Sequence, residues 1–253
     1  MGGSSEPPYL YLHLTIYLYT FQLYSKLINN MNSIKTILWK DIISELRTKE
    51  LISSMAAFSI VLIVLFNFSL TITRENAVFI VPPLLWISIV FIGTLGLSRS
   101  FAIEKENSAI TGVLLSPVDR SMLYFAKVLS NFIFIFIIQI ILTALFIFLF
   151  NLSFKGSFFN LVIVYIVGGL GFSSLGTLFS TMAINTKLRE LILPVILFPL
   201  LIPLLINAIK ATEILFNGGI FGEIVPNIKI LVCFDIIFLV SSALVYEYVV
   251  EDS

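Results

Sequence analysis

Long apolar runs, separated by shorter polar segments, dominate the pattern along this chain. Each run is close to the roughly 20 residues that a helix, rising about 1.5 Å per residue, needs to cross a hydrocarbon core about 30 Å thick. The runs are apolar on every face and do not alternate, so they predict transmembrane helices and not barrel strands. The six predicted spans are Ser53–Thr71, Ala77–Leu97, Val128–Phe150, Phe158–Met182, Leu191–Ala208 and Ile228–Val249.

The charges between the runs predict an orientation. Of the 15 Lys and Arg residues, eleven fall in one set of connections and four in the other. Positive charge is enriched in cytoplasmic loops, so the richer set, which includes the segment before the first span, is predicted to be cytoplasmic. Six spans then return the C-terminus to the same side. The sequence therefore predicts an all-α, multi-pass protein of a prokaryotic cytoplasmic membrane, with both termini in the cytoplasm.

Composition supports this class and excludes others. Hydrophobic residues make up 58% of the chain and charged residues 12%, whereas soluble domains carry about 25% charged residues. With one Cys (Cys233) and one His (His13), the chain cannot form an internal disulfide or supply the roughly four ligands of a Cys/His zinc site. We expect contacts with membrane lipids and no nucleic-acid partner.

The first fifty residues divide into two parts. Residues 1–30 contain a Tyr-rich apolar stretch, Tyr9–Tyr24, which is short for a span. It could be a marginal seventh span, a signal-like segment or an interfacial helix, or Met31 could be the true start. Residues 31–50 predict an amphipathic helix along the inner membrane surface, with Trp39 as an interfacial residue. That helix could be a simple membrane anchor or a docking element for a partner; residues 51–253 would form the transmembrane domain.

The cytoplasmic connection from Ser98 to Lys127 is the strongest candidate for contact with a partner. It combines acidic and basic positions with a proline that would end a short helix, and a solvated connector is the alternative. The candidate coupling residues are Glu104, Glu106, Pro117, Asp119 and Arg120. We expect charge reversal at Glu104 to disrupt coupling to that partner without unfolding the bundle.

Inside the predicted spans, three groups of residues are candidates for function or packing. Pro194, Pro199 and Pro203 predict a kinked or opened fifth span, acting as a hinge or polar strip of a passage or simply as a static kink. Asp235 is the one acid well inside a span; it could face the bundle interior, helped by Asn131 and Gln139, or lie near the outer interface. The third group predicts a close-packing helix face toward another helix or a second copy, and consists of Gly169, Ser173, Gly176 and Ser180.

On the outer side, residues 211–227 are half apolar and contain three glycines and a proline. This segment is too short to span the membrane and too apolar for a free loop. We expect a re-entrant or interfacial turn, where a periplasmic partner could dock.

Three collinear segments resemble the haem exporter protein B (CcmB) family. They are Glu104–Ser121, Gly171–Glu190 and Leu193–Ile206, and the similarity runs from about Trp39 into the last span. Ser108 and Ala126 stand where the family would have Gly, and residues before Met31 match nothing in it. The resemblance implies a six-helix permease subunit of an ABC transporter that pairs with a separate ATPase. In that family the complex serves cytochrome c maturation, with a haem-handling membrane protein and a periplasmic haem chaperone.

The residues agree with a subunit that is not itself an enzyme. No Gly in the chain is followed by Lys, so the phosphate-binding motif G-x-x-x-x-G-K-[ST] is missing and ATP would act through the partner. We expect no stably bound cofactor, because haem-ligating side chains are few; haem could still be a substrate passing between helices. A general ABC-2 type exporter of lipid, polysaccharide or drug shares this architecture and is the alternative function.

Overall fold

The computed structural model describes residues 34–45, 47, 49–70, 76–106, 119–152, 154–183 and 189–251, and regular structure within them is entirely helical. A first helix occupies residues 34–45. The long helices are α2 (Glu50–Ser69), α3 (Ala77–Glu106), α5 (Arg120–Leu149), α6 (Phe158–Ala183), α7 (Arg189–Phe216) and α8 (Phe221–Glu251).

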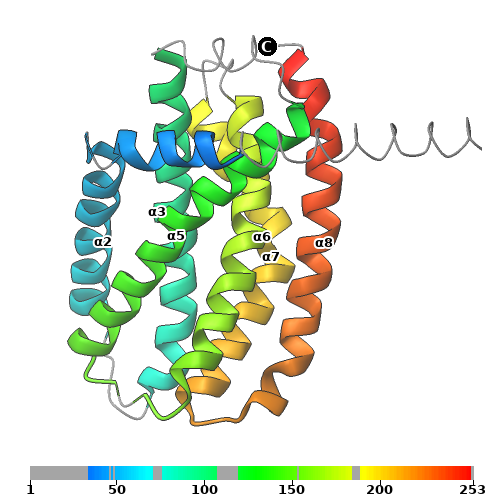
Figure 1. The fold of residues 1–253 in the computed structure, drawn as a ribbon. Helices are drawn as coiled ribbons and strands as arrows, with labels where there is room; N and C mark the ends of the chain where they lie inside the picture. Colours follow the sequence, from blue (N-terminus) through cyan, green and yellow to red (C-terminus); the bar gives the residue numbers. More distant parts are fainter. Residues whose placement is uncertain are drawn as a thin grey trace, which may run out of the picture.

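All six long helices are apolar and long enough to cross a membrane, which confirms the predicted fold class. They run up and down in a single bundle, as Figure 1 shows. The starts of α2, α5 and α7 lie at the same end as the last turns of α3, α6 and α8. We call this the basic end, because it carries the connections that are rich in Lys and Arg.

Several helices extend well beyond the predicted spans. Helix α5 begins at Arg120, eight residues before Val128, and reaches 30 residues, about 45 Å at 1.5 Å per residue. That exceeds the hydrocarbon thickness, and α5 runs diagonally across the bundle (Figure 1), as expected for a helix longer than the bilayer core. Because the first two turns of α5 contain polar residues, hydropathy alone does not predict them as part of the span.

The connection between α7 and α8 differs from the prediction. Helix α7 continues to Phe216 and α8 begins at Phe221, so the re-entrant turn expected over residues 211–227 is wrong. The chain turns at Gly218, whose φ of 90° is in the left-handed region that favours glycine. The amide of Gly219 donates to the carbonyl of Ile214 at 2.9 Å, which closes the end of α7. The apolar residues of this segment lengthen two helices.

Helix α6 lies at the centre of the bundle and packs against α3, α5, α7 and α8. Its glycines allow these approaches. A Cβ at Gly168 would lie 2.5 Å from Cη2 of Trp86 on α3, and one at Gly169 would lie 3.0 Å from Phe132 on α5. Small residues of this kind let helices pack closely in lipid, where apolar burial supplies no driving force between helices.

The deepest part of the core joins three helices around one indole. Trp86 is fully buried, and its Nε1–H donates to Oγ1 of Thr212 on α7 at 2.9 Å. Its ring lies edge-on to Tyr165 of α6, with centroids 5.9 Å apart. The indole N–H thus finds a partner inside the bundle, as a buried donor requires.

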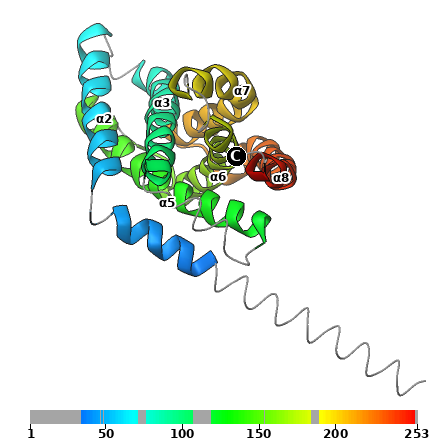
Figure 2. The same ribbon diagram turned by 90° about the horizontal axis from the view of Figure 1, so that it is seen from above.

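Helix 34–45 lies crosswise to the six long helices near the basic end (Figure 1). Viewed along the bundle, it runs beside α5 on the outside of the bundle and does not cover its end (Figure 2). This placement matches the amphipathic helix predicted from the sequence. Which membrane side it occupies stays a prediction of the charge rule.

Candidate functional site

An ion pair fastens helix 34–45 to the bundle. Nζ of Lys127 on α5 lies 2.8 Å from Oδ2 of Asp41, and the two side chains are only 11% and 10% exposed. Lys40 lies 3.3 Å from the other oxygen of the same carboxylate but is 45% exposed. A buried pair of this kind is costly to break from one side, because the remaining charge stays desolvated.

Apolar contacts reinforce this attachment. Ile37 is buried and belongs to a cluster contributed by α5, α6 and α8. The cluster sits at the basic end and is separate from the main core. Its buried members are Ile37, Leu123, Tyr124, Ala126, Val128, Leu178, Ala243 and Tyr246. Ile37 therefore joins an apolar cluster that also includes the ends of three transmembrane helices distant in sequence.

Glu45 fixes the corner between helix 34–45 and α2. Its side chain is 7% exposed, and Oε1 accepts a hydrogen bond from the backbone N–H of Ile52 at 2.8 Å. Lys49, in the corner itself, has a left-handed φ of 55°. A carboxylate that accepts an N–H in the first turn of a helix is stabilised by the positive end of the helix dipole.

Tyr124 joins α5, α6 and α8 inside the cluster. It is fully buried, its hydroxyl donates to the carbonyl of Ser174 at 3.0 Å, and its ring centroid lies 5.3 Å from that of Tyr246. Tyr124 therefore links α5 to both α6 and α8 at the basic end.

The predicted coupling residues lie at this same end. Glu104 and Glu106 are in the last turn of α3, although their side chains lie outside the described residues, as does Pro117 entirely. Asp119 is the N-cap of α5, and its carbonyl accepts the amide of Met122 at 2.9 Å. Arg120 is the first residue of α5. Their contact with an ATPase stays a prediction.

A polar seam runs along the α5–α6 interface. Nδ2 of Asn131 donates to Oγ1 of Thr177 at 2.9 Å, and nearer the opposite end Oγ1 of Thr143 lies 2.5 Å from the hydroxyl of Tyr165. Between them Gln139 is fully buried, and neither amide atom has a hydrogen-bond partner among the described residues. Gln139 packs beside Gly169 of α6.

Asp235 faces the bundle interior, one of the two positions that the sequence left open. It is 7% exposed and is fourteen residues from either end of the span Phe221–Val249, which does not fit a position at the outer interface. Its carboxylate packs against Gly171 of α6, and Oδ1 has no hydrogen-bond partner within the described residues. The expectation that Asn131 and Gln139 hydrogen-bond to Asp235 is wrong. Nδ2 of Asn131 donates to Thr177 of α6, and Gln139 packs beside Gly169 of α6.

The prolines of α7 do not interrupt the helix, which runs without a break from Arg189 to Phe216. Pro199 and Pro203 are exposed on the outside of the bundle and Pro194 is half-buried. Pro199 and Pro203 therefore do not line a passage inside this chain. A hinge at these positions stays a prediction.

The small residues of α6 face more than one neighbour. A Cβ at Gly176 would clash with Leu97 of α3, whereas Gly169 meets α5. Oγ of Ser173 donates to the carbonyl of Gly169 at 2.7 Å, and Ser180 is buried with no partner for its hydroxyl in the described part of the chain. This face packs within the chain and leaves no room there for a second copy.

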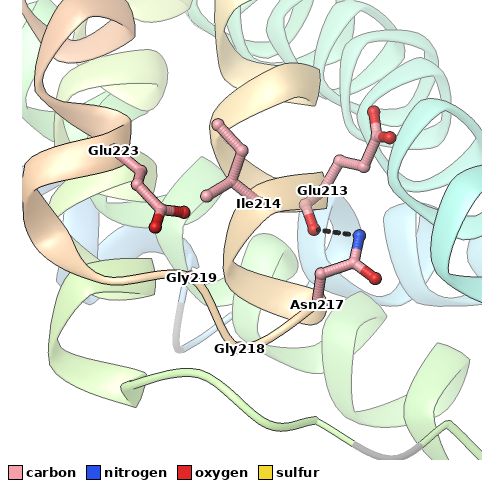
Figure 3. Close-up of a pocket in the computed structure, with 6 residues that line it drawn as sticks. All are labelled: Glu213, Ile214, Asn217, Gly218, Gly219 and Glu223. Carbon is pink, nitrogen blue, oxygen red and sulfur yellow. Dashed lines mark hydrogen bonds between the residues drawn. The ribbon is translucent and has the colours of Figure 1, made fainter.

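The opposite end of the bundle has an open hollow between α7 and α8 (Figure 3). Two carboxylates, Glu213 and Glu223, border it but point in different directions, and Nδ2 of Asn217 donates to the carbonyl of Glu213 at 3.2 Å. Within the described ranges, no group of three His, Cys, Asp or Glu residues could hold a metal ion. The hollow itself shows no convergent set of polar groups.

Sequence reasoning missed the residues that attach helix 34–45. The sequence alone does not single out Asp41 or Lys127, and Tyr124 lies outside the predicted third span Val128–Phe150. A usable signal was present: Lys127, Asn131, Gln139 and Thr143 repeat at helical spacing, which places them on one face of a continuous helix. The partners of that face, Asp41 and Thr177, could not be read from spacing.

The model of the family described as CcmB protein matches residues 32–251. No match is found among the curated proteins. The matched range contains helix 34–45 and all six spans, so it confirms the resemblance drawn from the sequence. The chain is a multi-pass membrane protein that belongs to the CcmB family, the membrane subunits of a haem-exporting transporter linked to c-type cytochrome biogenesis.

Proposed function

We propose that this chain is the permease subunit through which a separate ATPase drives a step of haem export or delivery in cytochrome c maturation. Family membership supports the transporter role. The observation that carries the coupling role is the attachment of helix 34–45 to α5 through the 2.8 Å Asp41–Lys127 pair. This pair couples a surface helix to the centre of the bundle.

The contacts define a route for mechanical coupling. A force on the basic end would act on helix 34–45 and on the α3–α5 connection, which begins at the end of α3 and finishes at Asp119. Lys127 and Tyr124 would pass the movement to α6 and α8. Because packed cores resist continuous deformation, such a push favours a shift between discrete helix arrangements.

The proposed substrate class rests on the family and on the apolar character of the bundle. Haem is large and mostly apolar, and it could move along helix surfaces without an axial ligand from this chain. A haem-handling membrane protein and a periplasmic haem chaperone are the proposed partners. No contact among the described residues identifies the substrate or the partners.

The test is haem staining of c-type cytochromes in cells with and without the gene. Covalently bound haem is expected to disappear in the deletion strain and to return when the gene is restored, including a version that starts at Met31. An Asp41→Lys variant should fail to restore it at equal protein level. Unchanged cytochromes in the deletion strain would instead favour a general ABC-2 type exporter.

A further inference from the structure

Folding separates the charges of helix 34–45 onto two faces. The helix contains two acids, Asp41 and Glu45, and both turn toward the bundle, one to Lys127 and the other to the N–H of Ile52. The opposite, exposed side carries Lys35, Trp39, Lys40 and Ile43, and Arg47, just beyond residues 34–45, is also exposed. Nζ of Lys40 also lies 3.3 Å from Oδ1 of Asp41. A segment that carries both signs in the sequence thus presents a cationic and apolar face outward.

The apolar members of this face are large and well exposed. Trp39 is 65% exposed and Ile43 is 42% exposed. They lie on a helix that runs crosswise beside the bundle, level with the start of α2 and below the last turns of α3 and α8 (Figures 1 and 2). In a membrane, that level corresponds to the boundary between headgroups and acyl chains, where Trp is enriched.

We infer that the outward face of helix 34–45 is a binding surface for anionic phospholipids of the adjacent leaflet. Lys35, Lys40 and Arg47 complement negative headgroups, while Trp39 and Ile43 enter the upper acyl region. Interfacial helices that combine Lys and Arg with large apolar residues bind anionic membranes in this way. A protein partner fits less well, because the cores of protein interfaces are depleted of Lys and this helix lies beside the bundle and not over its end.

The consequence for the molecule is that two different attachments hold the helix. The inner face is bound to α5 by a buried ion pair, and the outer face is bound to lipid. Lipid composition would then set how firmly the helix is held, independently of which substrate the protein transports.

The chain's own tryptophans provide the assay. There are two, Trp39 and Trp86, and Trp86 is fully buried. The full chain is placed in vesicles of phosphatidylcholine and phosphatidylglycerol at equal mole fractions, with bromine on the acyl chains of one lipid or the other. Bromine quenches a tryptophan that it contacts. Quenching by the brominated anionic lipid is expected to exceed quenching by the zwitterionic one by about twofold.

Matched variants separate this face from general charge effects. Lys35→Gln, Lys40→Gln and Arg47→Gln together should bring the ratio to about one, as should about 1 M salt. The control removes three exposed lysines from the opposite end, Lys155, Lys210 and Lys229, and should keep the ratio near two. A Trp39→Phe variant should lose the preference, and circular dichroism checks that each variant remains helical.

Three outcomes would overturn the inference. One is equal quenching by the two lipids in the unaltered chain. Another is a preference that survives in the triple variant or in Trp39→Phe, since it would then come from elsewhere in the protein. The third is a triple variant that no longer binds the ATPase subunit, which would make this a protein-docking face. None of these results depends on cytochrome maturation, so they test this inference separately from the proposed function.

Discussion

Breaking the Asp41–Lys127 pair should release helix 34–45 from the bundle while leaving the six spans intact. The two side chains are 10% and 11% exposed, so solvent screens the pair only weakly. Asp41→Asn leaves the Lys127 ammonium buried without its carboxylate, and removing one member of such a pair costs about 3–5 kcal/mol. Lys127→Met should cost less, about 1.5 kcal/mol, because Lys40 still lies 3.3 Å from the Asp41 carboxylate.

Hydrogen exchange of residues 34–45 measures this difference directly. At 1.4 kcal/mol per tenfold, a loss of 3 kcal/mol corresponds to roughly 100-fold faster exchange, up to the rate of an unprotected peptide. Amides of α6, the central helix, should be unchanged. The charge-swapped protein, with Asp41→Lys and Lys127→Asp, should recover part of the protection.

Lys40→Gln is the matched control, because it removes a cation from the same carboxylate at an exposed position. It should change exchange by no more than about fivefold, since exposed pairs contribute about 0–1 kcal/mol. If Asp41→Asn changed exchange as little as Lys40→Gln does, the ion pair would not attach the helix and the coupling route would lose its first step.

Three further results are expected. Gly156→Ala should lower the free energy of unfolding by about 1–3 kcal/mol, because the new Cβ would meet a backbone carbonyl of α7; Gly222→Ala has open space around it and should shift thermal unfolding little. Asn131→Leu and Thr177→Val should show a coupling energy of about 0.6–1.7 kcal/mol in a double-mutant cycle, typical of interhelical hydrogen bonds in membranes, and an additive pair would mean that the 2.9 Å bond contributes nothing. Asp235→Asn should leave expression unchanged but lower haem-stained cytochromes about tenfold, since an acid in the middle of a span is costly to insert and usually marks a functional position; normal staining would assign the carboxyl to packing.

The candidate site was only partly readable from the sequence. The amphipathic pattern of residues 31–50 indicates a surface helix, and Asp119 and Arg120 belong to the connection predicted to contact a partner. That Asp41 meets Lys127 could not be predicted, because residues 86 positions apart share no local pattern. Asp235 shows the same limit: its type indicated importance, but its neighbour Gly171 depends on how α6 and α8 pack.

Hydropathy by itself determined the fold class and the six spans of this protein, because length and apolar content suffice to place a helix in lipid. Tertiary structure alone decided where helices begin and end at the polar margins, as at Arg120 and Phe221, since packing against neighbours can stabilise turns that hydropathy excludes. It also decided which charges face inward. Helix 34–45 has both signs along its length, and only its position beside α5 turns the acids to the bundle and the bases outward.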